Sequence, residues 1–97
     1  MKFTSTRTRV STAGTRVQLS NVTDRVRYIK VSARTGNSGV VYFGGSGVSS
    51  TVGYELSAND SLELNFGEQG GTVALSTFWA DSSATKQDLD WVAITED

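Results

Sequence analysis

The stretch from residue 39 to residue 66, GVVYFGGSGVSSTVGYELSANDSLELNF, constrains the fold more than any other part of the sequence. Its first run, residues 40–43, is β-branched and aromatic and is bracketed by glycines, which favours a strand over a short piece of helix. Residues 61–66 alternate between polar and apolar side chains, the period of a strand with one buried and one solvated face. The stretch therefore predicts three strands joined by two polar turns, the second at residues 57–60, and it is a fold signal, not an active site.

The rest of the chain has the same character. Thirteen Ser and twelve Thr among 97 residues, with ten Gly, form a composition typical of strands and turns. Short predicted strands recur at intervals of about ten residues and are separated by Gly, Ser and Asn. We therefore predict an all-β fold, a small antiparallel β-sandwich or jelly-roll-like barrel with an extended N-terminal arm.

The length is that of one domain, which we divide into an N-terminal arm or edge strand (residues 1–13) and a single β-domain (residues 14–97). A domain of this size buries only about two-thirds of the surface of its unfolded chain, so its core is small. With no Cys and no His, neither a disulfide nor a Cys or His zinc site can reinforce it. Oligomerisation is the common remedy that remains.

The arm alternates between two kinds of side chain. Thr4, Thr6 and Thr8 fall on one side, whereas Phe3, Ser5, Arg7 and Arg9 fall on the other. Almost nothing in it is apolar, so it is not a central core strand. It either pairs with a neighbouring subunit or acidic surface, because an unpaired edge is a template for strand addition, or is a frayed terminus.

Charge is distributed unevenly along the chain. Residues 1–34 contain eight Lys or Arg against one Asp, and residues 35–97 contain one Lys against nine Asp or Glu. The two oppositely charged halves can attract each other within one sheet or between subunits, or either half can be attracted to a charged surface. In the first case basic and acidic strands are simply neighbours, and each exposed pair contributes roughly 0 to 1 kcal/mol.

Several other segments carry specific expectations. In residues 22–33, Val26 and Ile29 face the same side only if a bulge lies near Arg27 or Tyr28. Residues 35–39 (TGNSG) predict a hairpin connection, residues 67–71 a turn, and residues 81–87 a polar loop. Residues 72–80 predict one strand with Val73 and Leu75 inward, and residues 88–95 predict the last strand.

Candidate catalytic or metal-binding residues are few, so we expect no enzyme and no cofactor. The commonest general base, His, is absent. Asp88 and Asp90 lie on one side of a strand, but a calcium ion needs six to eight oxygen ligands, and a solvated acidic face is the simpler interpretation. The glycines at 44, 45 and 47 do not open a helix, so they are not a phosphate-binding loop. Arg7, Arg9 and Arg16 have no aromatic neighbours, so we expect no nucleic-acid partner.

The aromatic residues have two interpretations. They are the bulk that a small core or a subunit interface requires, or some of them form a platform for sugars. Phe78 and Trp79 are adjacent, so both cannot face the core of a simple sandwich, and one of them is exposed or covered by another chain.

The order of parts resembles small structural proteins of tailed bacteriophage virions. The matching parts are VYFGGSGVSS, GYEL, SLELNF, a strand near TFWA and the final strand DLDWVAI, and the resemblance covers roughly residues 26 to 97. Members of that group often have a Pro-Gly-Glu turn before the alternating strand, where this chain has Ala58-Asn59-Asp60 and no proline. The resemblance implies a capsid decoration (cement) protein on the virion surface, which binds the major capsid protein and assembles as a homotrimer.

On that interpretation, Phe3, Arg7 and Arg9 contact the capsid or a neighbouring subunit, and Phe78 or Trp79 lies at the subunit interface. The alternative is a tail or fibre-associated carbohydrate-binding β-module that stacks sugars on Tyr42, Tyr54 and Trp79. The sequence has no apolar run of about 18 residues and no signal-peptide core in MKFTSTRTRV, so we expect synthesis in the host cytoplasm and no membrane partner.

Overall fold

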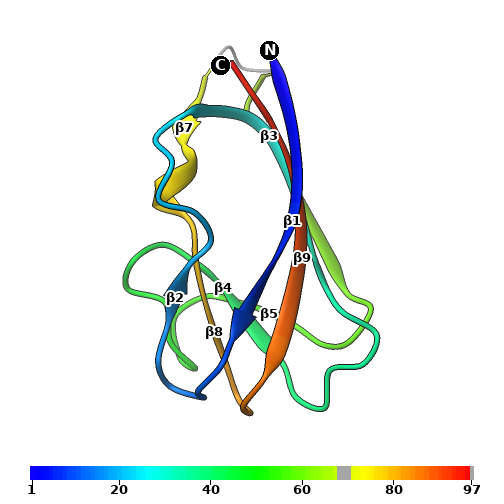
Figure 1. Cartoon of the computed structure of the whole chain (residues 1–97). Helices are drawn as coiled ribbons and strands as arrows, with labels where there is room; N and C mark the ends of the chain where they lie inside the picture. The colour runs from blue at the N-terminus through cyan, green and yellow to red at the C-terminus, as the bar shows by residue number, and fades with distance from the viewer. Residues whose placement is uncertain (68–70, 97) are drawn as a thin grey trace.

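A computed structural model describes residues 1–67 and 71–96 of the chain. Two antiparallel sheets pack face to face (Figure 1), which confirms the predicted β-sandwich. Sheet A has the strand order β1-β9-β3-β6, and β7 also pairs with β3. Its strands are β1 (Lys2–Val10), β9 (Gln87–Thr95), β3 (Arg25–Ala33), β6 (Ser61–Asn65) and β7 (Val73–Ala74).

Sheet B is smaller and has the order β2-β8-β4-β5. Its strands are β2 (Val17–Gln18), β8 (Trp79–Ser82), β4 (Val41–Gly44) and β5 (Tyr54–Leu56). A short 3-10 helix, η2 (Leu75–Thr77), precedes β8. Among the described residues no helix is long and apolar enough to cross a membrane.

The core lies between the sheets and takes side chains from both. Fully buried residues include Val10, Ile29, Leu56 and Leu89. In β6, the alternation predicted from the sequence is confirmed, because its leucines pack against the core while its polar residues are exposed. Burial of this apolar surface, at roughly 25 cal/mol per Å², is the main stabilising term for the sandwich.

Strand β1 is the edge strand of sheet A. It pairs with β9 along its whole length, from Lys2 opposite Thr95 to Val10 opposite Gln87. Its outer side carries Phe3 and the arginines, whereas Val10 is completely buried. The indole Nε1 of the buried Trp91 also donates a hydrogen bond to Thr8 Oγ1 at 3.0 Å. Residues 2–10 are therefore part of the sandwich.

The bulge expected in the third strand is confirmed. The pairing of β3 with β9 shifts register between Val26 and Tyr28. Val26 and Ile29 are consequently both buried, although a regular strand would place them on opposite faces.

The predicted hairpin connection at residues 35–39 was wrong, and the predicted turn at residues 57–60 is confirmed. Residues 35–39 do not close a hairpin, because β3 belongs to sheet A and β4 to sheet B. Residues 57–60 form a turn in which Asn59 adopts a left-handed φ of 74°, and this turn leads from β5 in sheet B to β6 in sheet A. Local sequence specifies a turn, whereas the sheet that each strand joins is decided by which faces can be buried.

The single strand predicted over residues 72–80 was also wrong. The chain forms β7 in sheet A, turns through η2 and enters sheet B as β8. The turn is fixed by hydrogen bonds from Leu75 N to Asp24 O (2.9 Å) and from Phe78 N to Leu75 O (3.3 Å). It lets Leu75 and Phe78 both enter the core, whereas one straight strand would place residues three apart on opposite faces and bury only one of them.

The polar loop predicted over residues 81–87 begins later than expected. Asp81 and Ser82 belong to β8 and are buried. The Asp81 carboxylate tolerates burial because its Oδ1 accepts hydrogen bonds from Gly14 N (3.0 Å) and Ser82 N (2.7 Å). The turn predicted over residues 67–71 falls partly on residues 68–70, which lie outside the described residues.

Candidate functional site

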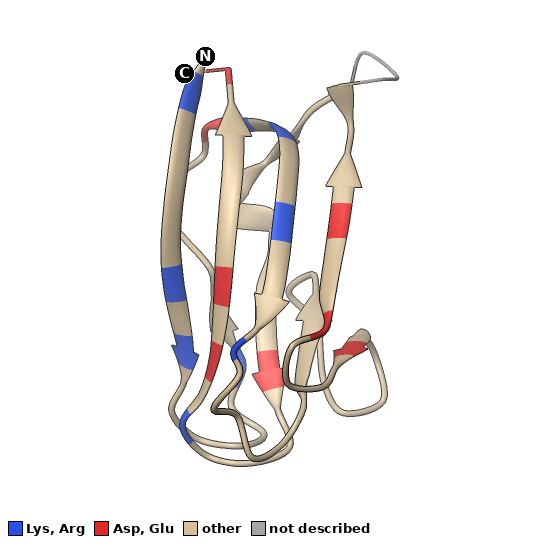
Figure 2. Cartoon of the chain, turned by 90° about the vertical axis from the view of Figure 1, so that its right-hand side faces the viewer, with Lys and Arg blue, Asp and Glu red and all other residues tan. Residues whose placement is uncertain are grey.

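The outer face of sheet A brings together three of the predicted contact residues. Figure 2 looks onto this face, where strands β1, β9, β3 and β6 carry basic, acidic, basic and acidic residues in turn. The pairing places Phe3 opposite Ile94, Ser5 opposite Val92, and Arg7 opposite Asp90. We call this surface the sheet A face and define it by Phe3, Ser5, Arg7, Arg9, Asp88, Asp90, Val92, Ile94, Tyr28, Lys30 and Glu63.

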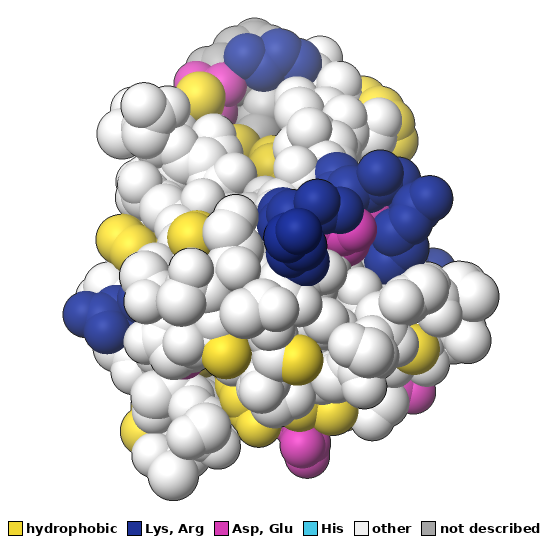
Figure 3. Space-filling model, turned by 60° about the horizontal axis from the view of Figure 1, so that its bottom comes forward, with side chains coloured by type: hydrophobic (Ala, Val, Ile, Leu, Met, Phe, Trp, Pro, Cys, Tyr) yellow, Lys and Arg dark blue, Asp and Glu magenta, His cyan; other side chains and the backbone are white. Residues whose placement is uncertain are grey.

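Ion pairs between β1 and β9 organise one end of this face. Arg9 donates to Asp88 from Nε at 2.8 Å and from Nη2 at 3.1 Å, and Arg7 Nε donates to Asp90 Oδ1 at 2.8 Å. Arg34 Nη1 lies 3.6 Å from the other Asp90 oxygen. Figure 3 shows basic side chains gathered around acidic atoms on the forward end of the molecule. The opposite charges of the two halves of the chain therefore meet within one sheet.

These contacts change the ionisation of Asp88. The hydrogen bond from Arg9 holds the pKa of the Asp88 carboxyl below its ordinary value, and burial only partly opposes this effect. The same bond raises the pKa of Arg9. Both groups therefore remain charged at neutral pH, and the pair is a fixed part of the surface.

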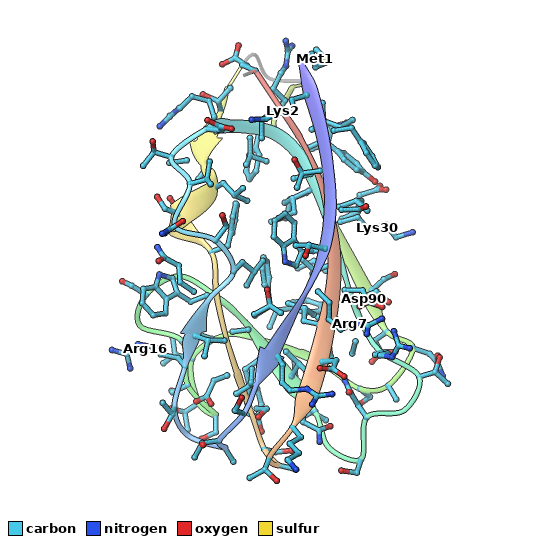
Figure 4. All side chains as sticks on the ribbon, viewed as in Figure 1. Met1, Lys2, Arg7, Arg16, Lys30 and Asp90 are labelled. Atoms are coloured by element: carbon cyan, nitrogen blue, oxygen red, sulfur yellow. The ribbon has the colours of Figure 1, made fainter. Side chains whose placement is uncertain are left out.

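A shallow groove of about 410 Å³ runs across the centre of the sheet A face. Val92 on β9 lies at its centre, with Ser5 on β1 and Lys30 on β3 at the flanking register positions. Figure 4 shows Arg7 beside Asp90 and Lys30 extending away from the sheet. The hollow exists because Val92 and Ser5 are short, whereas the side chains around them are long.

The other end of the sheet A face is apolar. Phe3 is 66% exposed, and Ile94 and Tyr28 follow it in register across the sheet. The Tyr28 hydroxyl donates to Glu63 Oε2 at 2.5 Å, which raises the pKa of Tyr28 and fixes its ring over the sheet. The sheet A face thus has an apolar row, a central groove and an ion-paired end, an anatomy suited to binding another protein.

Phe78 does not lie on a surface, so its predicted place at a subunit interface needs correction. Its side chain is only 6% exposed and stacks on Phe43 with ring centroids 5.5 Å apart. Burial of Phe78 leaves its neighbour Trp79 on the outer side of sheet B, where it is partly exposed. Of this adjacent pair, Trp79 is the aromatic residue available to a ligand or partner.

The three aromatic residues expected to stack sugars do not form one platform. Tyr42 lies opposite Asp81, and Trp79 lies opposite Gly44, so both occupy the outer face of sheet B. Tyr54 is opposite Phe43, which faces the core, and it is 53% exposed only because it lies at the end of its strand. Alternation along β4 and β5 therefore separates Tyr54 from the other two.

Trp79 instead lines a separate pocket of about 430 Å³ together with Gly14, Thr15, Arg16 and Ser46. We call this the Trp79 pocket. Its residues come from the β1–β2 connection, from β8 and from the loop after β4. Sequence reasoning missed Arg16 and Ser46 because neither lies near Trp79 in the sequence. It also missed the groove that is centred on Val92.

No site for a metal emerges from the acidic residues. Among residues 1–67 and 71–96, no group of three or more Asp or Glu residues is placed to hold a metal ion. Asp88 and Asp90 instead bind arginines.

Comparison with known proteins adds little to this geometry. No protein-family model and no curated protein matches the chain. A chain from a structure of Bacillus endospore appendages, described there as disulfide-linked pili, is similar with a TM-score of 0.44 and 11% identity over 99% of this chain and 88% of that one. The present chain has no cysteine. A likeness this weak carries no argument about function.

Proposed function

We propose that the chain is a non-enzymatic structural subunit of a bacteriophage virion, a capsid decoration protein that binds the major capsid protein. The observation that carries the proposal is the sheet A face, which presents the exposed Phe3 beside an apolar row and a shallow groove. A protein that covers a seam between subunits needs a broad complementary surface and no reacting groups. The virion setting rests on the resemblance described above.

The chemistry of the sheet A face supports protein binding in two ways. Its apolar row provides surface whose burial drives association. Its charges alternate from strand to strand, and Arg7 and Arg9 are already neutralised by Asp90 and Asp88. Charges that are already paired within the chain orient a bound protein on this face more than they increase its binding affinity.

Labelling of virions tests the setting directly. An antibody raised against the purified chain is applied with gold particles to phage released from cells that encode it. We expect gold over the capsids of intact particles. Gold confined to tails favours a tail module, and unlabelled particles from a lysate that contains the protein contradict the virion assignment.

A second candidate function, carbohydrate binding, is favoured by the Trp79 pocket. Its ring is partly exposed, and the pocket also contains the hydroxyls of Thr15 and Ser46. We propose this module function for sheet B, on the side of the molecule away from the sheet A face. This carbohydrate site does not include Tyr54, which lies on the other side of sheet B.

A further inference from the structure

The Trp79 pocket contains one positively charged side chain, Arg16, that is not used to stabilise the fold. Arg16 forms no ion pair or hydrogen bond with any of the described residues, whereas Arg7, Arg9 and Arg34 all bind carboxylates. Figure 4 shows Arg16 projecting outward from the sheet B side of the molecule. A guanidinium without an internal partner, next to a tryptophan, is suited to bind an anionic group of a ligand.

The position of Arg16 relative to Trp79 follows from strand pairing. Gln18 on β2 lies opposite Trp79 on β8, and Arg16 is two residues before Gln18. Arg16 therefore shares the outer side of sheet B and stands diagonally next to Trp79. Diagonal neighbours in a sheet are roughly 7 to 8 Å apart, within reach of aromatic and long side chains.

Buried contacts hold both walls of the pocket. On one side, the Asp81 carboxylate accepts a hydrogen bond from Gly14 N at 3.0 Å and so fixes the segment that carries Arg16. On the other side, the Val48 side chain is 1% exposed and packs closely against Gly44. A Cβ on Gly44 would lie 3.3 Å from Val48 Cγ2. This packing fixes the loop that carries Ser46, so the pocket is built before a ligand arrives.

We propose that the Trp79 pocket binds an acidic sugar, a pyranose that bears a carboxylate. The C–H face of the sugar ring stacks on the indole, and Arg16 binds the carboxylate through two parallel N–H donors. Thr15 and Ser46 hydrogen-bond the ring hydroxyls. None of the described residues that line the pocket carries a carboxylate, and the nearby Asp81 carboxylate is engaged by Gly14 N. This inference rests on the second candidate function and names its ligand class.

Nucleic acid also combines flat rings with anions, but the chain fits it less well. Binding a nucleic-acid strand draws on several phosphate contacts. The pocket offers one cation, and the whole chain has a net charge of −1. A single anionic group on a stacked ring matches one guanidinium better than a repeating phosphate backbone does.

Two-dimensional NMR of the full-length, 15N-labelled chain tests the proposal. The chain has two tryptophans, so two indole N–H signals are expected. Trp91 is 3% exposed and hydrogen-bonded to Thr8, so its signal is the internal control. The probes are a galacturonic acid trisaccharide, the galactose trisaccharide of the same linkage and a short oligothymidylate.

The acidic trisaccharide is expected to shift the Trp79 signal and leave the Trp91 signal in place. Arg16→Gln should weaken that binding by about tenfold or more, because a hydrogen-bonded charge is lost. Lys30→Gln removes the same charge on the opposite sheet and should leave binding unchanged. In Trp79→Ala, which lacks the Trp79 indole signal, the backbone N–H signals of Thr15, Arg16 and Ser46 report binding, and neither sugar should shift them.

The remaining outcomes separate the two proposals. Equal binding of the neutral trisaccharide, unaffected by Arg16→Gln, overturns the acidic-sugar proposal and leaves carbohydrate binding standing. Absence of any shift at millimolar sugar overturns both. Tighter binding of the oligothymidylate than of the acidic sugar overturns both in favour of nucleic acid.

Discussion

Single residues show how the chain uses its uneven charge. Arg9 and Asp88 are 79 positions apart in the sequence and form a two-bond contact across β1 and β9. Asp88 is only 7% exposed, so its carboxylate needs this partner. The expected attraction between the two halves of the chain therefore joins the first strand to the last.

The ionisation of Asp88 leads to a prediction about pH. Its pKa is lowered in the folded chain, so it stabilises the fold at any pH above its ordinary value of 3.8. That contribution is lost as the pH falls through the lower, folded-state value. Asp88→Asn should therefore unfold at lower denaturant than the wild type at pH 7, and the difference should shrink below pH 3.8. A difference that persists undiminished at pH 2 would show that the ion pair is not its cause.

The outward position of Phe3, Arg7 and Arg9 could be predicted from the sequence, because alternation along one strand fixes which residues share a face. Their partners could not. A shift of one residue in the pairing of β1 with β9 would give every side chain a different neighbour, and local sequence does not encode that register. The same reason explains why Arg16 and Trp79 were not recognised as neighbours.

At the level of elements, the loop between β4 and β5 depends on one glycine. Gly53 has a φ of 148°, and a Cβ there would lie 2.6 Å from Val48 Cγ2 and 3.2 Å from Phe43 O. Gly47 lies in the same loop, and a Cβ built there meets nothing within 4 Å. The two positions form a matched pair for a test of this loop.

Gly53→Ala should lower the free energy of unfolding by about 1 to 3 kcal/mol, because the strained backbone and the contact with Val48 both oppose it. Gly47→Ala should change it by less than about 1 kcal/mol. Denaturant unfolding of both variants measures the difference. Equal effects would mean that the backbone at Gly53 is not constrained as described.

The sequence allowed us to predict where strands form, but not which of the two sheets each strand joins. The alternation in residues 61–66 and the bulge near Tyr28 both followed from periodicity, and both are confirmed. The division of residues 72–80 between two sheets did not, because strand propensity is high on both sides of η2. Only the need to bury Leu75 and Phe78 together determines the turn.

For the whole molecule, the sandwich separates two surfaces. The sheet A face presents Phe3, the groove at Val92 and the paired arginines, and sheet B presents the Trp79 pocket. We propose that a homotrimer, the assembly implied by the resemblance, would join the sheet A face of one subunit to a different surface of the next, because a face that pairs with itself gives a dimer. Contact of the sheet A face with the capsid or with a second subunit would cover Val92.

The central claim, that the sheet A face binds protein, is tested by molar mass for the case in which the partner is a second copy of this chain. Light scattering on a size-exclusion column is applied to the wild type, to Val92→Glu at the centre of the face, and to Val52→Glu as the matched control. Val52 is 60% exposed on the loop between β4 and β5.

We expect the wild type and Val52→Glu to have the mass of a trimer, three times the 10.4 kDa of one chain, and Val92→Glu to have the mass of one chain. A charge buried in the contact without a partner is the cause of that dissociation. A wild type that stays monomeric at every concentration, or a Val92→Glu assembly as large as that of the wild type, would contradict assembly of this chain through the sheet A face.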